Sequence, residues 1–167
     1  MTLSYTTTNQ RGRLHLDFIK VSNFSEIADE FHKRVSEMVW CSVATVDTLG
    51  RPRTRVLHPI WGDHIGWIGT YRNSVKSKHI AKKPNMSIAY IKDPMKPVYV
   101  ECTVEWIDDM AEKERVWALF KSIPEPYGYD PAPIFGAFDD ENYGLLKLTP
   151  WRVEVYTIAV ESKIWKA

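Results

Sequence analysis

The feature that most constrains the fold is a run of strand-like segments joined by very short turns. Residues 39–47 are rich in β-branched side chains, and a turn at 47–50 leads into a second such segment, 53–61. A tight turn at Gly62 then leads into a third segment, 64–70. Two hairpin connections in succession require neighbouring strands to run antiparallel. The centre of the sequence therefore predicts an antiparallel β-meander.

Three helices are predicted around these strands. The first begins at Asn23, with Glu26 three residues later in a capping-box pattern. The second covers 74–83, and the third runs over 109–121. The apolar residues of the first helix recur on a single face: Phe24, Ile27, Phe31, Val35 and Met38. That pattern predicts that the first helix packs against the sheet.

Further strands are predicted at 86–91, 98–107, 145–157 and 162–165. About six strands with a few short helices favour a mainly β fold, a small and predominantly antiparallel barrel with helical additions. Residues 1–21 are interpreted as an N-terminal arm with a short strand near 14–18. Residues 22–167 are interpreted as one domain.

A segment rich in proline and aromatic residues, 122–144, interrupts this pattern. It contains four prolines and five aromatic residues. The prolines predict a loop without regular structure. Because the aromatic side chains need apolar surface, the loop is interpreted either as a lid over a binding pocket or as a plug at one end of the barrel.

The chain has 167 residues, of which 44% are hydrophobic and 26% charged, close to the averages of globular domains. No apolar run approaches the roughly 20 residues that cross a bilayer, and the first residues lack a secretory pattern. We therefore expect a soluble cytoplasmic protein. Cys41 and Cys102 are interpreted as buried thiols, and the five histidines have no metal-ligand spacing.

The charge distribution points to a local anion site. The net charge is +1, but the segment from Arg51 to Lys83 holds eight basic residues and one acidic residue, a charge of +7. The remainder of the chain, with 14 basic and 20 acidic residues, carries −6. A basic block within a strand-rich region of an otherwise acidic chain predicts that an anion binds there.

A compound motif lies within this block. Gly50, Pro52, Arg55 and Leu57 form the pattern G-x-P-x-x-R-x-L at a turn leading into a strand, and the continuation of the motif is Thr70, Ser74, Lys76 and Pro84. An arginine fork and a lysine suit a phosphate group. Hydroxyl groups and free N–H groups at a helix start complete such a site. The motif therefore predicts a phosphate-binding site.

These residues resemble the FMN-binding split β-barrel family, which includes pyridoxamine 5'-phosphate oxidase. The resemblance implies a six-stranded antiparallel split barrel that forms a homodimer, with FMN at the subunit interface. It implies that Arg55, Ser74 and Lys76 hold the FMN phosphate. It also implies that the ribityl chain and flavin ring are lined by Val56, Leu57, Gly69 and Thr70. Val75 occupies a position where the family often has arginine, so one phosphate contact is expected to be missing.

The sequence departs from the oxidases of that family at the substrate. Where they have a lysine that helps hold the substrate phosphate, this chain has His58, Pro59 and Ile60. Its C-terminus also lacks their segment bearing arginine and histidine. We therefore expect an FMN-dependent oxidoreductase that acts on an unidentified small molecule other than pyridoxamine phosphate. No catalytic residue is assigned.

Other functions fit parts of the same pattern. A deazaflavin-dependent reductase of the same fold would also use Lys78, Lys82 and Lys83. Haem binding or degradation is another reading, and so is a non-catalytic flavin-binding stress or sensor protein. The basic segment with Trp67 and Tyr71 could bind RNA, but it matches no nucleic-acid module. Neither a nucleic-acid nor a membrane partner is therefore predicted.

Overall fold

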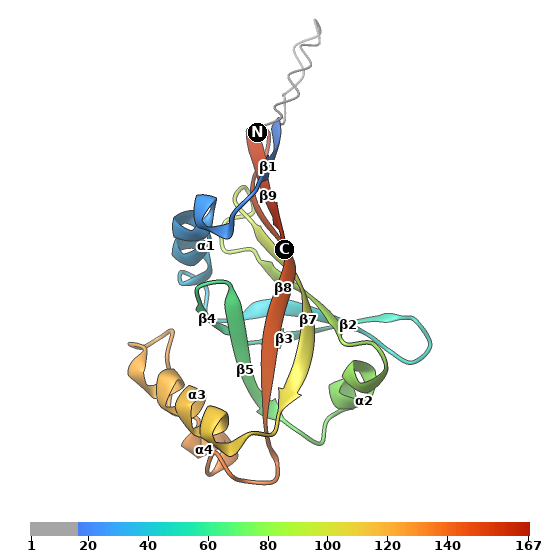
Figure 1. Ribbon diagram of the computed structural model, residues 1–167, viewed down its shortest axis with the longest axis vertical. Helices are drawn as coiled ribbons and strands as arrows, with labels where there is room; N and C mark the ends of the chain where they lie inside the picture. Colours follow the sequence, from blue (N-terminus) through green and yellow to red (C-terminus); the bar gives the residue numbers. More distant parts are fainter. Residues whose placement is uncertain (1–16) are drawn as a thin grey trace, which may run out of the picture.

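The computed structural model describes residues 17–167, which form one nine-stranded sheet with helices around it (Figure 1). The strands pair in the order β1-β9-β8-β7-β6-β2-β3, and β5 joins β8 and β4 away from this path. The central strands are β2 (Cys41–Val46), β3 (Pro52–Leu57), β4 (Ile60–Gly62), β5 (Ile65–Tyr71), β6 (Asn85–Tyr90) and β7 (Val98–Ile107). The predicted mainly β fold is confirmed. The predicted meander is divided into two antiparallel hairpins, because β3 pairs with β2 and β4 pairs with β5.

The sheet divides along its longest strand, β8 (Tyr143–Thr157). One edge of β8 pairs with β7 along nearly its whole length. The other edge pairs first with β5 and then with β9 (Glu161–Lys166). The sheet does not close completely, but the arrangement agrees with a split barrel, as predicted.

The described residues contain nine strands, more than the about six expected for the barrel, and two of them differ from the predicted segments. The predicted strand 53–61 is divided into β3 and β4 at His58 and Pro59, because proline has no N–H to donate to the sheet. At the start of the described chain, β1 (Asp17–Val21) pairs in parallel with β9. Most of the predicted arm and the start of its strand lie in residues 1–16, outside the described residues.

The helices lie close to their predicted positions. The first is divided into a 3-10 turn, η1 (Phe24–Glu26), and α1 (Ala28–Val35). The next, α2 (Val75–Lys82), follows Ser74 and lies at the right in Figure 1, below the β2–β3 hairpin. The third, α3 (Met110–Ser122), begins where the Asp109 carboxylate accepts a hydrogen bond from the Glu112 N–H at 2.8 Å. None of the helices within residues 17–167 is long and apolar enough to cross a membrane.

Two apolar cores hold the structure together. The larger lies inside the sheet and is covered by α1, whose predicted apolar face packs into it. Cys41 and Cys102 are buried there as free thiols, as predicted, and burial raises the pKa of each to about 12. The smaller core joins β5 and the start of β8 to α3 and to the segment that follows α3.

The proline-rich segment is more regular than predicted. It contains a short helix, α4 (Ala132–Phe135), which begins after Pro131. Proline at a helix start loses no hydrogen bond, because the first N–H groups of a helix have no partner within it. Phe135 is 8% exposed and belongs to the smaller core. This part of the segment is therefore structural.

Candidate functional site

The hairpin between β2 and β3 is organised by one carboxylate, that of Asp47. It accepts hydrogen bonds from the Leu49 and Arg51 N–H groups at 2.9 and 3.0 Å. It also pairs with the Arg51 and Arg53 side chains at 2.8 and 3.4 Å. The Arg51 N–H hydrogen bond is the main cause that lowers the pKa of Asp47 below its usual value. Arg51 and Arg53 of the basic block therefore stabilise the turn between β2 and β3 through their ion pairs with Asp47.

Arg55 is held differently, on the face of the hairpin that α2 covers. Its guanidinium donates to the Thr45 hydroxyl at 2.8 Å, and that hydroxyl lies 3.0 Å from Nδ1 of His79 on α2. Thr45 and His79 are buried. The threonine hydroxyl accepts from Arg55 and has one proton of its own, which satisfies Nδ1 if the His79 proton is on Nε2. The pair orients one edge of the guanidinium and leaves its other donors available.

Lys76 supplies a second cation, and unlike half-buried Arg55 it is buried. Its Nζ donates to the Ser74 hydroxyl at 2.9 Å, and the lysine is only 7% exposed. Burial is the main cause that lowers the pKa of Lys76 to about 8, and repulsion from Arg55 adds to it. Burial also lowers the pKa of Arg55. The two cations are therefore close enough to repel each other in the ligand-free protein.

Neither cation is neutralised by the protein. Within residues 17–167, no carboxylate forms an ion pair with Arg55 or Lys76, whereas Arg51, Arg53 and Arg72 each have one. Isolated buried charges are costly unless they are paired. Adjacent unpaired cations therefore form a site for an anion, and the two nearby hydroxyl groups suit a phosphate.

A large cavity, the apolar cavity, has Lys76 in its wall and a volume of about 630 Å³. Its walls come from β3, β5, the segment before β2 and the proline-rich segment. They consist of Val39, Trp40, Leu57, His58, Gly69, Thr70, Tyr71, Lys76, Pro126, Tyr129, Ile134 and Phe135. Apart from Lys76 the walls are mostly aliphatic and aromatic. The cavity can hold a planar apolar group with its charged end at Lys76.

Gly69 explains part of the shape of this cavity. A Cβ at this position would lie 3.2 Å from the Tyr129 hydroxyl and 3.2 Å from the Tyr143 ring. That is too close for an ordinary contact, so the bare backbone lets the two tyrosines approach β5. Burial raises the pKa of Tyr129 to about 12, so its hydroxyl stays protonated.

The predicted site residues are distributed over two neighbouring cavities. Leu57, Gly69, Thr70 and Lys76 line the apolar cavity. Arg55 and Val75 line a second cavity of about 500 Å³, the cationic cavity, between the β2–β3 hairpin and α2. Ser74 contacts Lys76. Val56 is 62% exposed on β3 and lines neither cavity.

Several residues of the site were not found from the sequence. Trp40, His58 and Tyr129 form an aromatic row along the apolar cavity, with ring centroids 5.5 and 5.1 Å apart. They come from three distant segments, so no local pattern could connect them. One weak indication of His79 was present in the sequence: it lies three residues after Lys76, and residues at this spacing share one face of a helix.

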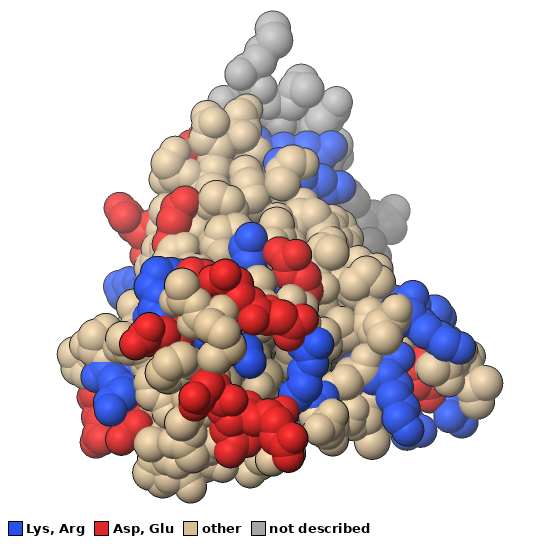
Figure 2. All heavy atoms as spheres, turned by 60° about the horizontal axis from the view of Figure 1, so that its bottom comes forward, with Lys and Arg blue, Asp and Glu red and all other residues tan. Residues whose placement is uncertain are grey.

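Basic and acidic side chains gather in different regions of the surface. Figure 2 shows Lys and Arg side chains gathered at the right, where the β2–β3 hairpin and α2 lie in Figure 1. Acidic side chains gather toward the bottom of that view. The basic block of the sequence is therefore a basic region of the molecule.

Residues 27–156 match the pyridoxamine 5'-phosphate oxidase family, and the chain belongs to that family. No curated protein matches the sequence. The family assignment agrees with the resemblance noted from the motif.

Solved structures show the same fold. A protein related to general stress protein 26 from Clostridium acetobutylicum has a TM-score of 0.69 at 17% identity, over 84% of this chain and 94% of its own. An FMN-binding protein related to pyridoxamine 5'-phosphate oxidase from Nostoc punctiforme has a TM-score of 0.58 at 18% identity, over 83% and 85%. The heme storage protein of Vibrio cholerae has a TM-score of 0.60 at 18% identity, over 78% and 94%.

Proposed function

We propose that this protein binds FMN, with the phosphate at Arg55, Ser74 and Lys76 and the flavin ring in the apolar cavity. The observation that carries the proposal is the pair of cations without a carboxylate partner within residues 17–167: half-buried Arg55 lines the cationic cavity, and buried Lys76 lines the neighbouring apolar cavity. A flavin is a planar, largely apolar ring whose chain ends in a phosphate, so its two ends match these two environments. The related FMN-binding protein from Nostoc punctiforme supports the same cofactor.

The protein is then an oxidoreductase acting on a small molecule. Bound FMN supplies electron or hydride transfer. The chain supplies the anchor at Arg55 and Lys76, and it surrounds the ring with side chains that exclude water. Lys76 gains an anionic partner, which offsets the burial and the repulsion from Arg55 that lower its pKa in the ligand-free protein.

The cofactor site is proposed to lie at a homodimer interface. Among the strands of residues 17–167, β3 pairs only with β2, which leaves its other edge unpaired there. Its Val56 is 62% exposed, and exposed Trp40 and Val75 lie in the walls of the apolar and cationic cavities. Exposed apolar side chains around an open strand edge are typical of a protein interface. A second copy would cover both them and the bound cofactor.

The absorbance spectrum of the purified protein and a pair of titrations test the cofactor. We expect the spectrum of oxidised flavin, and tighter binding of FMN than of riboflavin, which has the same ring and no phosphate. Equal affinities for the two flavins would refute the phosphate site. A haem or deazaflavin spectrum would refute FMN as the cofactor.

Light scattering tests the assembly. We expect a mass about twice that of the chain when FMN is bound. A monomer that retains FMN would refute the interface site while leaving the phosphate site intact.

A further inference from the structure

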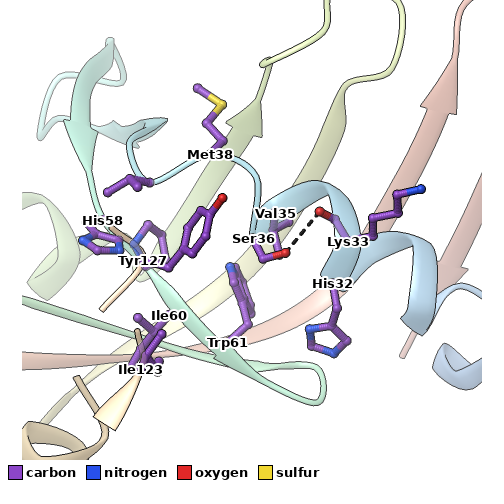
Figure 3. Close-up of a pocket in the computed structure, with 12 residues that line it drawn as sticks. His32, Lys33, Val35, Ser36, Met38, His58, Ile60, Trp61, Ile123 and Tyr127 are labelled. Carbon is purple, nitrogen blue, oxygen red and sulfur yellow. Dashed lines mark hydrogen bonds between the residues drawn. The ribbon is translucent and has the colours of Figure 1, made fainter. Parts of the chain in front are cut away.

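A third cavity lies beside the apolar cavity and plays no part in the proposed FMN site (Figure 3). We call it the His58 cavity; it has a volume of about 400 Å³. Its walls come from the end of α1, the segment before β2, the β3–β4 connection and the loop after α3. The side chains that matter below are Met38, His58, Trp61, Ile123 and Tyr127.

The His58 cavity shares a wall with the apolar cavity. His58 and Val39 line both. The loop after α3 also separates them, because Tyr127 lines the His58 cavity while Tyr129 lines the apolar cavity. A molecule in the His58 cavity would therefore be a neighbour of one in the apolar cavity.

The titratable side chains that line the His58 cavity are those of His32, Lys33, His58 and Tyr127. No Asp, Glu or Arg within residues 17–167 lines it, and its one ammonium group, on Lys33, belongs to an exposed residue. Burial lowers the pKa of His58, which is 8% exposed, so its ring is neutral. The cationic cavity, in contrast, is lined by three arginines. A phosphorylated or carboxylated ligand would have no buried partner in the His58 cavity.

Two polar groups can orient a ligand there. His58 hydrogen-bonds to the Tyr127 backbone, and among the described residues no side chain hydrogen-bonds to its ring. The Tyr127 hydroxyl has no partner within residues 17–167, and Figure 3 shows it directed toward the space between Met38 and Ser36. Ser36 itself already donates to the Lys33 carbonyl at 3.1 Å. The Tyr127 hydroxyl is therefore a free donor in an otherwise apolar cavity.

We propose that the His58 cavity binds an uncharged aromatic molecule of one or two rings, held by a hydrogen bond from the Tyr127 hydroxyl to a carbonyl oxygen. The volume lies within the range of about 300–1,000 Å³ that is usual for small-molecule sites, as does the combination of apolar walls with few polar groups. Identifying this molecule as the reaction partner of the flavin rests on the proposed function, whereas the binding site itself does not.

Two matched probes test the proposal. 2-Acetylnaphthalene is an uncharged ketone, and 2-naphthoate has the same rings with a carboxylate in place of the acetyl group. Calorimetric titration at pH 7.5 should show the ketone binding roughly tenfold tighter or more, because the carboxylate would lose its hydration without gaining a partner. Binding of the ketone should persist when FMN is bound. A preference for 2-naphthoate, or competition between the ketone and FMN, would overturn the assignment.

Two substitutions locate the site. Met38→Trp fills the cavity and should abolish ketone binding, while Met95→Trp, at an exposed methionine that lines none of the three cavities, should leave it unchanged. Tyr127→Phe removes the hydroxyl alone and should weaken binding of the ketone by about two- to tenfold. Unchanged ketone binding in both Met38→Trp and Tyr127→Phe would overturn the proposal.

The outcome is separable from that of the proposed function. If FMN fails to bind but the ketone binds and Met38→Trp abolishes it, the His58 cavity stands and the flavin proposal fails. If FMN binds normally but the ketone does not, the cavity assignment alone fails.

Discussion

The two ends of the proposed cofactor site are built in different ways. The cationic end comes from the β2–β3 hairpin and the start of α2, where hydrogen bonds of 2.8–3.0 Å fix Arg55, Thr45 and His79. The aromatic end comes from the proline-rich segment, which approaches β5 through ring contacts such as Tyr71–Phe135 at 5.1 Å. Directed polar bonds hold the first end, and non-directional packing holds the second.

This difference separates ligand recognition from stability. The cationic end keeps one buried and one half-buried cation that no carboxylate within residues 17–167 neutralises, which weakens the ligand-free fold and favours an anion. In the aromatic end, Phe135 belongs both to the smaller core and to the wall of the apolar cavity, whereas neighbouring Ile134 is 49% exposed and belongs to the wall alone. Substitutions at the first end should therefore change affinity, and those at the second should change either stability or the cavity.

The largest effect is expected at Phe135. Phe135→Ala removes a buried ring that contacts Tyr71 and Tyr143, and it should lower the free energy of unfolding by about 3–5 kcal/mol. Ile134→Ala should change it by about 0.5 kcal/mol or less, because the side chain is exposed. Denaturant titrations of both variants measure this. Similar losses would show that the segment is not divided between a core and a cavity wall.

The next effect is expected at the two cations. Arg55→Ala and Lys76→Ala should each weaken FMN binding by about 1.5–3 kcal/mol, the range for hydrogen bonds to charged groups. Riboflavin, which lacks the phosphate, should bind each variant as it binds the original protein. Lys82→Ala is the matched control, since this exposed lysine lies on the same helix. If FMN and riboflavin binding were weakened equally, the two cations would not act through the phosphate, and the two ends of the site would not differ in function.

A pH dependence should follow from Lys76. Its pKa of about 8 in the ligand-free protein rises when an anion binds beside it. Below pH 8 the lysine is already charged and FMN affinity should be constant, down to about pH 6, where the phosphate gains a proton. Above pH 8 binding must take up a proton, so affinity should fall by a factor that approaches about ten per pH unit.

The Lys76→Arg variant is the control for this pH dependence, because arginine remains charged. Its FMN affinity should stay level between pH 7 and 9.5. If the original protein showed the same level profile, Lys76 would not be the group that meets the phosphate.

The smallest effect is expected from the support of Arg55. Thr45→Val keeps the buried shape but removes the hydroxyl between Arg55 and His79. FMN binding should weaken by about 0.5–1.5 kcal/mol, the usual value of one neutral hydrogen bond, and riboflavin binding should not change. An effect as large as that of Arg55→Ala would mean that Thr45 acts on the fold of the hairpin rather than on the orientation of the guanidinium.

The sequence by itself determined most of the order of strands and helices, apart from α4, and it singled out Arg55, Ser74 and Lys76 of the cationic end. Alternation in 41–46 and the turn at 47–50 are local patterns, and the run from Ser74 to Lys76 lies at a helix start that its own residues define. The charge excess between Arg51 and Lys83 was also visible without a structure. Such features could be predicted because their causes act between residues close together in the chain.

The tertiary structure alone decided which charges are paired and which side chains meet across the cavities. The sequence contains three arginines between 51 and 55, but only the fold assigns Arg51 and Arg53 to Asp47 and leaves Arg55 without a carboxylate partner within residues 17–167. Likewise His58, Trp40 and Tyr129 meet because β3, the segment before β2 and the loop after α3 pack together. Contacts of this kind depend on distances between remote segments, and those distances are set by packing of the whole core rather than by any local pattern.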